Sequence, residues 1–165
     1  MTASAPSARG YWLMKSEPDE ASIDHLMQAP QQTLPWTGVR NYQARNFMRD
    51  AMQLGDGVLC YHSSCAQPGI AGLARVTGRA LPDTTQFDPA SPYFDPKSKS
   101  KSTPAPPRWL QIVVTLERKT RLMTLAEMRL APELATLRTL QRGNRLSITP
   151  VTPSEWQAVL ARLGG

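Results

Sequence analysis

The segment WTGVRNYQARNFMRD, residues 36–50, combines polar and aromatic side chains with the apolar spacing of a helix. From residue 44 onward, apolar side chains recur at positions i, i+3, i+4 and i+7, which predicts a short helix with one face on the core. Asn41 is the expected N-cap, because its side chain can accept a hydrogen bond from the first helical turn. The groups from Trp36 to Asn41 would therefore be held by a rigid helix. The apolar positions are Ala44, Phe47, Met48 and Ala51.

The rest of the chain has the composition of an ordinary globular protein. Its 165 residues are 41% hydrophobic and 19% charged, and no apolar run is long enough to cross a bilayer. We expect a single domain over residues 11–165, preceded by a disordered N-terminal arm over residues 1–10. The arm lacks the apolar middle of a secretory signal, which favours a cytoplasmic protein.

Charge and cysteine content narrow the classes of partner. The formal net charge of +6 favours polyanionic partners. Cys60 and Cys65 are too few for a disulfide framework. With His62 they offer three soft ligands, but a fourth ligand and the paired spacing of zinc sites are missing. We therefore expect no metal and no cofactor.

Alternating short apolar runs and turn signals predict an α+β domain around a mostly antiparallel sheet. Expected strands cover residues 11–14, 109–118 and 144–149, together with a hairpin formed by residues 54–62 and 69–78. Ser22 is placed to cap a helix ending near residue 28, and Thr152 and Glu155 form a capping box before the last helix. Residues 124–140 predict one broken or two short helices, with the break at Pro132. The proline-rich residues 82–107 predict no regular element.

Motifs of catalysis are absent from the sequence. It has no glycine-rich phosphate loop, nucleophile elbow or metal motif, and it holds two histidines, His25 and His62. Aromatic residues instead stand beside basic, amide or hydroxyl groups at several separated places. This pattern is typical of base recognition, in which rings stack on a base and polar groups contact its edge. The places are Trp12 with Lys15, Trp36 with Arg40 and Asn41, Tyr61 with His62 and Ser63, and Arg108 with Trp109. Trp12 and Trp156 are expected in the core.

Seven segments in order carry a resemblance to a known family. They are YWLMKSEP (11–18), WTGVRNYQARNFMRD (36–50), YHSSC (61–65), PGIAGLARV (68–76), PYFDPKSK (92–99), PRW (107–109) and RLSITPVT (145–152). With them the sequence resembles an EVE domain, the module of the thymocyte nuclear protein family within the PUA-like superfamily.

The resemblance implies a PUA-like, strongly curved mixed β-sheet or pseudo-barrel surrounded by short helices, with a pocket at its mouth. It also implies a non-enzymatic nucleic-acid-binding domain that recognises a modified base. The expected base is a modified cytosine, and DNA is expected as the partner in preference to RNA. The residues placed around the base are Lys15, Ser16, Trp36, Gly38, Val39, Arg40, Asn41, Tyr61, His62, Ser63 and Trp109. The expected phosphate contacts are Arg45, Arg49, Lys97 and Lys99, although solvated surface charges would look the same.

Departures from the family pattern affect the pocket. Ser64 stands where the family usually has Asn, which removes an amide that could read a base. The Lys/Ser segment between Asp95 and Trp109 is longer than in relatives, which predicts a more mobile loop, and Leu110 replaces an aromatic or small polar residue.

Two other functions stay open. Related small PUA-like domains include amidohydrolases that act on acylated cytidine, and here Lys15 and Glu17 could share one face of a strand for such chemistry. A basic protein-interaction module would instead use the proline-rich residues 82–107 to bind an acidic partner.

Overall fold

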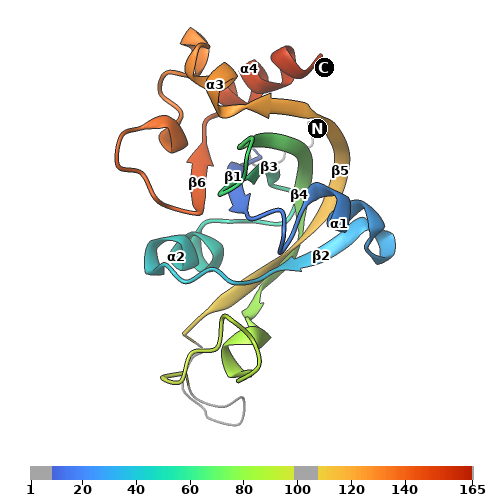
Figure 1. The fold of residues 1–165 in the computed structure, drawn as a ribbon, viewed down its shortest axis with the longest axis vertical. Coiled ribbons are helices and arrows are strands. Elements are labelled where there is room, and N and C mark those ends of the chain that lie inside the picture. Colours follow the sequence, from blue (N-terminus) through green and yellow to red (C-terminus); the bar gives the residue numbers. More distant parts are fainter. Residues whose placement is uncertain (1–8, 99–107, 165) are drawn as a thin grey trace, which may run out of the picture.

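The computed structural model describes residues 9–98 and 108–164, and its centre is one curved six-stranded sheet in the order β2-β5-β4-β3-β1-β6 (Figure 1). Neighbouring strands are antiparallel except β1 and β3, which run parallel. The expected α+β fold with a curved, mostly antiparallel sheet is therefore confirmed. The strands are β1 (Tyr11–Ser16), β2 (Thr33–Trp36), β3 (Gly57–His62), β4 (Gly69–Pro82), β5 (Leu110–Thr124) and β6 (Ile148–Val151).

The curvature of the sheet comes from the long hairpin of β4 and β5. Its register shifts at four places, and such irregularities bend and twist a strand pair. The expected hairpin of β3 and β4 is also present, with a shift between Cys60 and Tyr61. At Gly72 a side chain would not fit, because an added Cβ would lie 2.4 Å from Cδ1 of Ile23. Gly72 thus lets the helix that contains Ile23 pack closely on β4.

Short helices cover both faces of the sheet. The predicted caps are confirmed: Asn41 accepts a hydrogen bond from the N–H of Ala44 at 3.0 Å, and Thr152 and Glu155 form a capping box. In the described part of the chain, the longest helix has 11 residues, so none is long and apolar enough to span a membrane. The α-helices are α1 (Ile23–Gln28), α2 (Tyr42–Asp50), α3 (Leu125–Arg129) and α4 (Pro153–Leu163). The 3-10 turns are η1 (Pro30–Gln32), η2 (Thr84–Phe87), η3 (Pro132–Leu134) and η4 (Arg138–Leu140).

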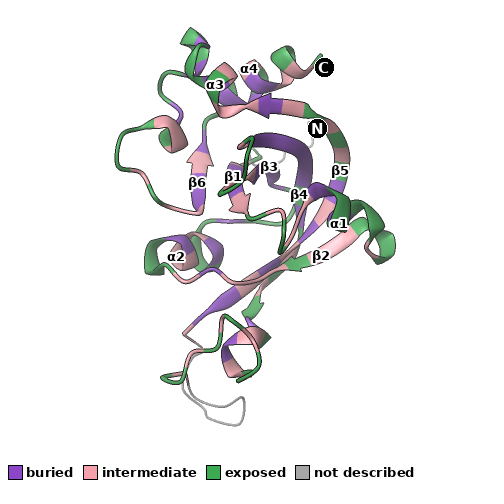
Figure 2. Cartoon of the chain, in the orientation of Figure 1, coloured by how far each residue is buried: buried purple, intermediate pink, exposed green. Residues whose placement is uncertain are grey.

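Buried residues lie along the strands and on parts of the helices (Figure 2). The buried hydrophobic residues form two clusters on opposite faces of the sheet. Along β1, Trp12 and Met14 belong to the first cluster, with residues of α1 and α2, while Leu13 belongs to the second, with residues of α3 and α4. This division follows from the alternation of side chains along a strand. Trp12 and Trp156 are both buried in these clusters, as the sequence predicts.

Several boundaries differ from the sequence-based expectation. β2 lies in a segment for which no strand is expected from the sequence, and η2 forms inside the proline-rich residues 82–107. The expected helical residues 124–140 contain one short α-helix and two 3-10 turns. Ala51 is exposed rather than part of the apolar helix face, because α2 ends at Asp50.

The N-terminal arm is described only from Arg9 onward. There, Gly10 donates its N–H to the carboxylate of Asp56 at 3.0 Å, and Arg9 pairs with Glu117 at 2.6 Å. The last two residues of the expected arm are thus attached to the folded domain. Residues 1–8 and 99–107 lie outside the described part.

Candidate functional site

The candidate site is a cavity of about 520 Å³, here called the main cavity, which opens between α1, the ends of β1 and β3, and the loop after β2. Its apolar lining comes from the first hydrophobic cluster and consists of Ile23, Leu26, Leu34, Val39, Cys60 and Val114. Polar side chains add hydroxyl, carboxylate, imidazole and guanidinium groups; they include Glu17, Glu20, Thr37, His62, Ser63, Tyr93 and Arg145. Such a mixed lining suits a ligand with an apolar face and a polar edge.

Seven of the eleven residues predicted around the base line the main cavity. They are Lys15, Ser16, Trp36, Gly38, Val39, His62 and Ser63. Lys15, Ser16, His62 and Ser63 meet because β1 and β3 run side by side in parallel, with Ser16 opposite His62. The other three residues come from β2 and the loop after it. Their contact with a base stays a prediction.

Tyr61 and Asn41 are placed away from the main cavity. Tyr61 alternates in direction with its neighbours Cys60 and His62, so its ring is buried in the second cluster on the other face of the sheet. Asn41 caps α2 with its side-chain oxygen and borders a separate hollow. The expectation that both residues border the main cavity therefore needs correction.

Trp109 also lies outside the lining of the main cavity. Its side chain is 7% exposed and stacks on the ring of Tyr42, with 4.9 Å between ring centroids. The indole N–H donates to Asp95 at 2.7 Å. These contacts occupy the ring face and the indole N–H of Trp109. Its side chain therefore stabilises the fold.

Arg40 binds within the protein rather than lining the main cavity. Its guanidinium donates to the carboxylate of Asp83 at 3.0 Å and to the carbonyl of Tyr93 at 2.8 Å. It also lies over the rings of Tyr93 and Trp109, 5.5 Å from each centroid. Arg40 therefore joins the wall of the main cavity to the segment after β4.

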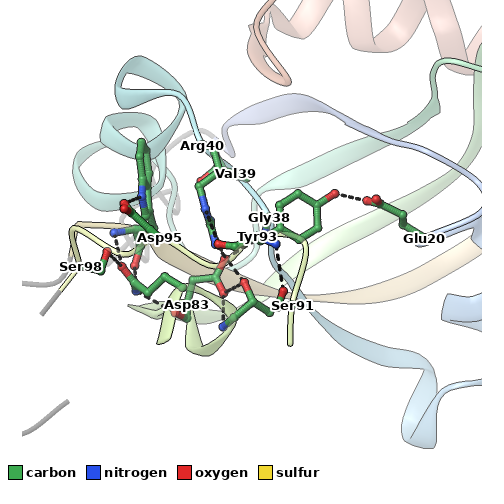
Figure 3. A network of polar contacts seen from close by, with 12 residues as sticks. Glu20, Gly38, Val39, Arg40, Asp83, Ser91, Tyr93, Asp95 and Ser98 are labelled. Atoms are coloured by element: carbon green, nitrogen blue, oxygen red, sulfur yellow. Dashed lines mark hydrogen bonds and ion pairs between the residues drawn. The ribbon is translucent and has the colours of Figure 1, made fainter. Parts of the chain in front are cut away.

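Asp83 is the centre of this polar network (Figure 3). Its carboxylate is fully buried and accepts hydrogen bonds from the N–H of Gly38 at 2.8 Å and from the N–H of Thr85 at 2.8 Å, besides the contact with Arg40. A buried carboxylate needs such donors, because it loses its hydration on folding. Asp83 was not among the residues predicted from the sequence, because its partners Gly38 and Arg40 lie more than forty residues away. Its only local signal is the cap that it provides for η2 through Thr85.

Tyr93 closes one side of the main cavity. Its ring packs on Gly38, where an added Cβ would lie 2.9 Å from Cζ of the ring. Gly38 also has a φ of +83°, a conformation that favours glycine. The Tyr93 hydroxyl donates to the carboxylate of Glu20 (Figure 3), and burial together with this hydrogen bond raises the pKa of Tyr93 to about 12. Tyr93 thus connects the segment after β4 to the segment before α1.

Gln86 attaches the same segment to the start of β5. Its fully buried amide donates to the carbonyls of Asp83 and Trp109 at 2.7 and 2.8 Å, and accepts from the N–H of Trp109 at 3.0 Å. The proline-rich excursion is therefore held by buried hydrogen bonds up to Ser98, and residues 99–107 lie outside the described part.

Two titratable groups of the main cavity have shifted pKa values. Nε2 of His62 accepts the N–H of Ile23 at 3.0 Å, and burial lowers the pKa of His62. A neutral imidazole that accepts at Nε2 carries its proton on Nδ1, which is then a donor. Burial also lowers the pKa of Lys15. Its ammonium lies 5.6 Å from the centroid of the Tyr61 ring, so the charged end of Lys15 is on the Tyr61 face of the sheet rather than against the apolar lining of the main cavity.

The expected phosphate contacts on α2 have partners within the protein. Arg45 donates to Asn46 and to the carbonyl of Arg108, and Arg49 donates to Asp50 at 2.8 and 2.9 Å. Both arginines border a second cavity of about 690 Å³ beside α2. Lys97 is exposed, and Lys99 lies outside the described residues. The phosphate role of these residues stays a prediction.

Metal ligands do not cluster in the described residues. No group of three His, Cys, Asp or Glu side chains lies close enough to hold a metal ion within residues 9–98 and 108–164. Cys60 is buried in the first cluster, where burial raises its pKa to about 12, and Cys65 is exposed.

Comparisons with known proteins extend this description. The family model described as EVE domain matches residues 10–162. Human thymocyte nuclear protein 1 is 42% identical, over 92% of this chain and 72% of that protein. A crystal structure of a protein from Pseudomonas putida is 47% identical with a TM-score of 0.82, covering 92% of this chain and 97% of that one. A crystal structure of human THYN1 in complex with DNA containing 5-methylcytosine is 40% identical with a TM-score of 0.84, covering 94% of this chain and 98% of that one.

These relatives correct one expectation and confirm another. The predicted cytoplasmic location is wrong by this comparison, because relatives about 40% identical are named as nuclear proteins. The resemblance carried by the seven sequence segments is confirmed by the match over residues 10–162. The chain belongs to the EVE domain family.

Proposed function

We propose that this protein binds DNA through a modified cytosine whose base enters the main cavity, and that it reads the base rather than transforming it. The observation that carries the proposal is the main cavity itself, with its apolar lining and the polar side chains of β1 and β3 around it. The complex of human THYN1 with 5-methylcytosine-containing DNA supports the choice of ligand.

The size of the main cavity suits one nucleotide base better than a duplex. Its volume of about 520 Å³ lies within the usual range of small-ligand pockets. A base that is stacked in a duplex cannot enter a concave pocket, so the target base has to flip out of the helix. The flipped base would then be enclosed by the side chains that line the main cavity.

Each group has a role that follows from its chemistry. The ring of Trp36 would stack on the base. The Nδ1–H of His62 would donate to an acceptor on the base edge. The hydroxyl of Ser63 donates to the carbonyl of Ser16 at 3.4 Å, so its oxygen would accept from a donor of the base. The apolar lining would contact the C5-methyl group, as apolar side chains do with the methyl group of thymine. The same apolar lining offers no hydrogen-bond or ion-pair partner to a charged group attached to the base.

The expected preference for the methylated base is modest. Burying one methyl group stabilises a complex by about 0.8 kcal/mol, which corresponds to roughly a fourfold difference in affinity. The stacking ring contributes more, about 1–3 kcal/mol per base. A useful assay must therefore resolve a fourfold difference between oligonucleotides.

Fluorescence anisotropy tests the proposal. The titrations would compare duplexes with one cytosine unmodified, methylated or hydroxymethylated, and the matching single strands and RNA. Wild type should prefer a modified duplex at least fourfold, and Trp36→Ala should weaken binding by roughly 5- to 150-fold. Trp36→Phe keeps an aromatic ring and should lose less affinity than Trp36→Ala, and thermal unfolding of both variants shows whether the fold is intact. Equal affinity for modified and unmodified DNA would reject a modification reader.

An amidohydrolase is the second candidate, because Lys15 and Glu17 border the main cavity and burial lowers the pKa of Lys15. Against it, the Lys15 ammonium lies near the Tyr61 ring on the other face of the sheet. A lysine with a lowered pKa is easier to use as a base. Incubation with an N4-acylated cytidine, followed by chromatography, decides between the candidates. We expect no deacylated product from wild type; product formation that Lys15→Ala abolishes would make the protein an enzyme.

A further inference from the structure

A second group of basic side chains lies beside the main cavity, on the segment of residues 138–145, here called the basic loop. It begins with η4 and ends before β6. The basic loop holds Arg138, Arg142 and Arg145, and the sequence has no acidic residue between Glu133 and Glu155. This concentration of positive charge has no nearby compensation along the chain.

The three arginines are free to bind a ligand. All three are exposed, and within residues 9–98 and 108–164 their guanidinium groups form no hydrogen bond or ion pair. The arginines of α2 differ, since Arg45 and Arg49 already donate to protein acceptors. A guanidinium without a protein partner keeps all five of its donors for an anion.

The basic loop is fixed in shape although its charged ends are exposed. Asn144 donates from its amide to the carbonyl of Arg138 at 2.7 Å and accepts from the N–H of Leu146 at 2.9 Å. Gln141 donates to the carbonyls of Ala135 and Leu137 at 2.9 and 3.2 Å. Side chains presented by such a preorganised loop lose less entropy when they bind.

Arg145 connects the basic loop to the main cavity. It lines the main cavity and also an adjoining open hollow of about 430 Å³, which is bordered by Asn41, Arg138 and Arg142. The N–H of Lys15 donates to the carbonyl of Ser147 at 2.8 Å, which attaches the end of the loop to β1. An open hollow bordered by the three arginines of the basic loop therefore adjoins the main cavity at a fixed position.

We propose that the basic loop binds the phosphodiester backbone of the strand whose base occupies the main cavity. The proposal rests on the proposed function, because the base fixes which strand lies there. Arginine binds phosphate with two parallel hydrogen bonds, so the loop would hold the phosphates next to the flipped nucleotide. Such contacts position the strand and carry no base selectivity. The basic loop would therefore add phosphate contacts that the sequence analysis did not include.

The salt dependence of DNA binding tests this inference. The Arg142→Ala/Arg145→Ala variant would be compared with wild type on methylated and unmethylated duplexes from 50 to 200 mM salt. Loss of two phosphate contacts should flatten the slope of log K against log salt by about 1.8. The ratio of the two affinities should stay unchanged. Arg142→Lys/Arg145→Lys keeps the charge and should keep most of the slope.

Arg75→Ala/Arg79→Ala is the matched control. It removes the same charge from two exposed arginines of β4, of which Arg79 borders the cavity beside α2. We expect it to leave the slope nearly unchanged. If the control flattens the slope as much as Arg142→Ala/Arg145→Ala does, or if that variant keeps the wild-type slope, the assignment of the basic loop is overturned.

The two proposals fail in different ways. A wild-type protein without base preference rejects the proposed function, while the slope comparison still decides whether the loop binds phosphates. A wild-type protein with base preference but with an unchanged slope in Arg142→Ala/Arg145→Ala rejects the inference alone. Thermal unfolding of each variant shows whether the exposed substitutions leave the fold intact.

Discussion

The carboxylate of Asp83 accepts the backbone N–H of Gly38 at 2.8 Å, which joins the end of β4 to the wall of the main cavity. The same oxygen accepts from Arg40 at 3.0 Å. The wall is therefore positioned by a buried charge from a distant part of the sequence. Variants around Asp83 and Gly38 should change both stability and ligand binding.

Asp83→Asn should lower the free energy of unfolding by about 2–4 kcal/mol. Removing one partner of a buried ion pair is strongly destabilising, and the partial exposure of Arg40 moderates the loss. Urea unfolding measures the change. Asp88→Asn is the control, since Asp88 is exposed and accepts from the N–H of Ala90 at 2.9 Å. Equal stability of the two variants would contradict a central role for Asp83.

Gly38→Ala should destabilise the protein more than Gly55→Ala. Both glycines have positive φ angles, +83° and +89°, so both substitutions cost roughly 1–2 kcal/mol of backbone strain. Only at Gly38 would the new Cβ overlap the Tyr93 ring, which adds about 1–3 kcal/mol. The difference in thermal unfolding midpoint between the two variants measures the effect of this overlap. We also expect weaker DNA binding by Gly38→Ala alone; unchanged binding would show that Tyr93 does not shape the cavity.

His62 should make the protein less stable below pH 6.5. Burial lowers the pKa of His62 from the ordinary value of 6.5. Below that pH the unfolded chain binds more protons than the folded one, so acid favours unfolding until the pH falls below the folded pKa. Protonation of Nε2 would also break the hydrogen bond from Ile23.

His62→Gln tests this pH dependence, because the glutamine carbonyl can still accept from Ile23 without titrating. Urea midpoints measured from pH 8 to pH 5 should fall less for the variant than for wild type. Parallel curves for the two proteins would assign the acid sensitivity to other groups.

Trp109→Phe and Trp36→Phe should separate stability from binding. Trp109→Phe removes the hydrogen bond to Asp95, which should cost about 1–3 kcal/mol of unfolding free energy and leave base preference unchanged. Trp36→Phe should lower affinity more than stability, because Trp36 lines the main cavity. Unfolding and anisotropy would be measured on both variants. A loss of base preference in Trp109→Phe would return this ring to the base-binding site.

The elements with local signals could be predicted from the sequence. Asn41 caps α2 and Thr152 caps α4, because a cap is read within four residues of chain. β2 could not be predicted in this way. Its sequence TLPW contains Pro35, which disfavours a central strand, but β2 lies at the edge of the sheet, where a missing N–H is tolerated.

The residues of the candidate site that lie at the ends of strands could be predicted from the sequence. Those that depend on contacts between distant segments could not. The segments YWLMKSEP and YHSSC contribute to the adjacent strands β1 and β3. This pairing brings together Lys15, Ser16, His62 and Ser63. Tyr61 alternates to the other face of the sheet, a direction that aromatic and polar composition alone does not fix. The roles of Asp83 and of the arginines of the basic loop depend on residues that are close in space but distant in the sequence.

The position of β1 between β3 and β6 has a consequence for biosynthesis. β1 is the first strand of the described chain, and its partner β6 begins at Ile148. At ribosomal speeds β1 waits on the order of ten seconds for that partner, with one edge unpaired. The cavity wall contributed by Ser147 arrives equally late. A nascent chain therefore gains a complete pocket only after Ile148 has been synthesised, and until then the unpaired edge of β1 is open to aggregation.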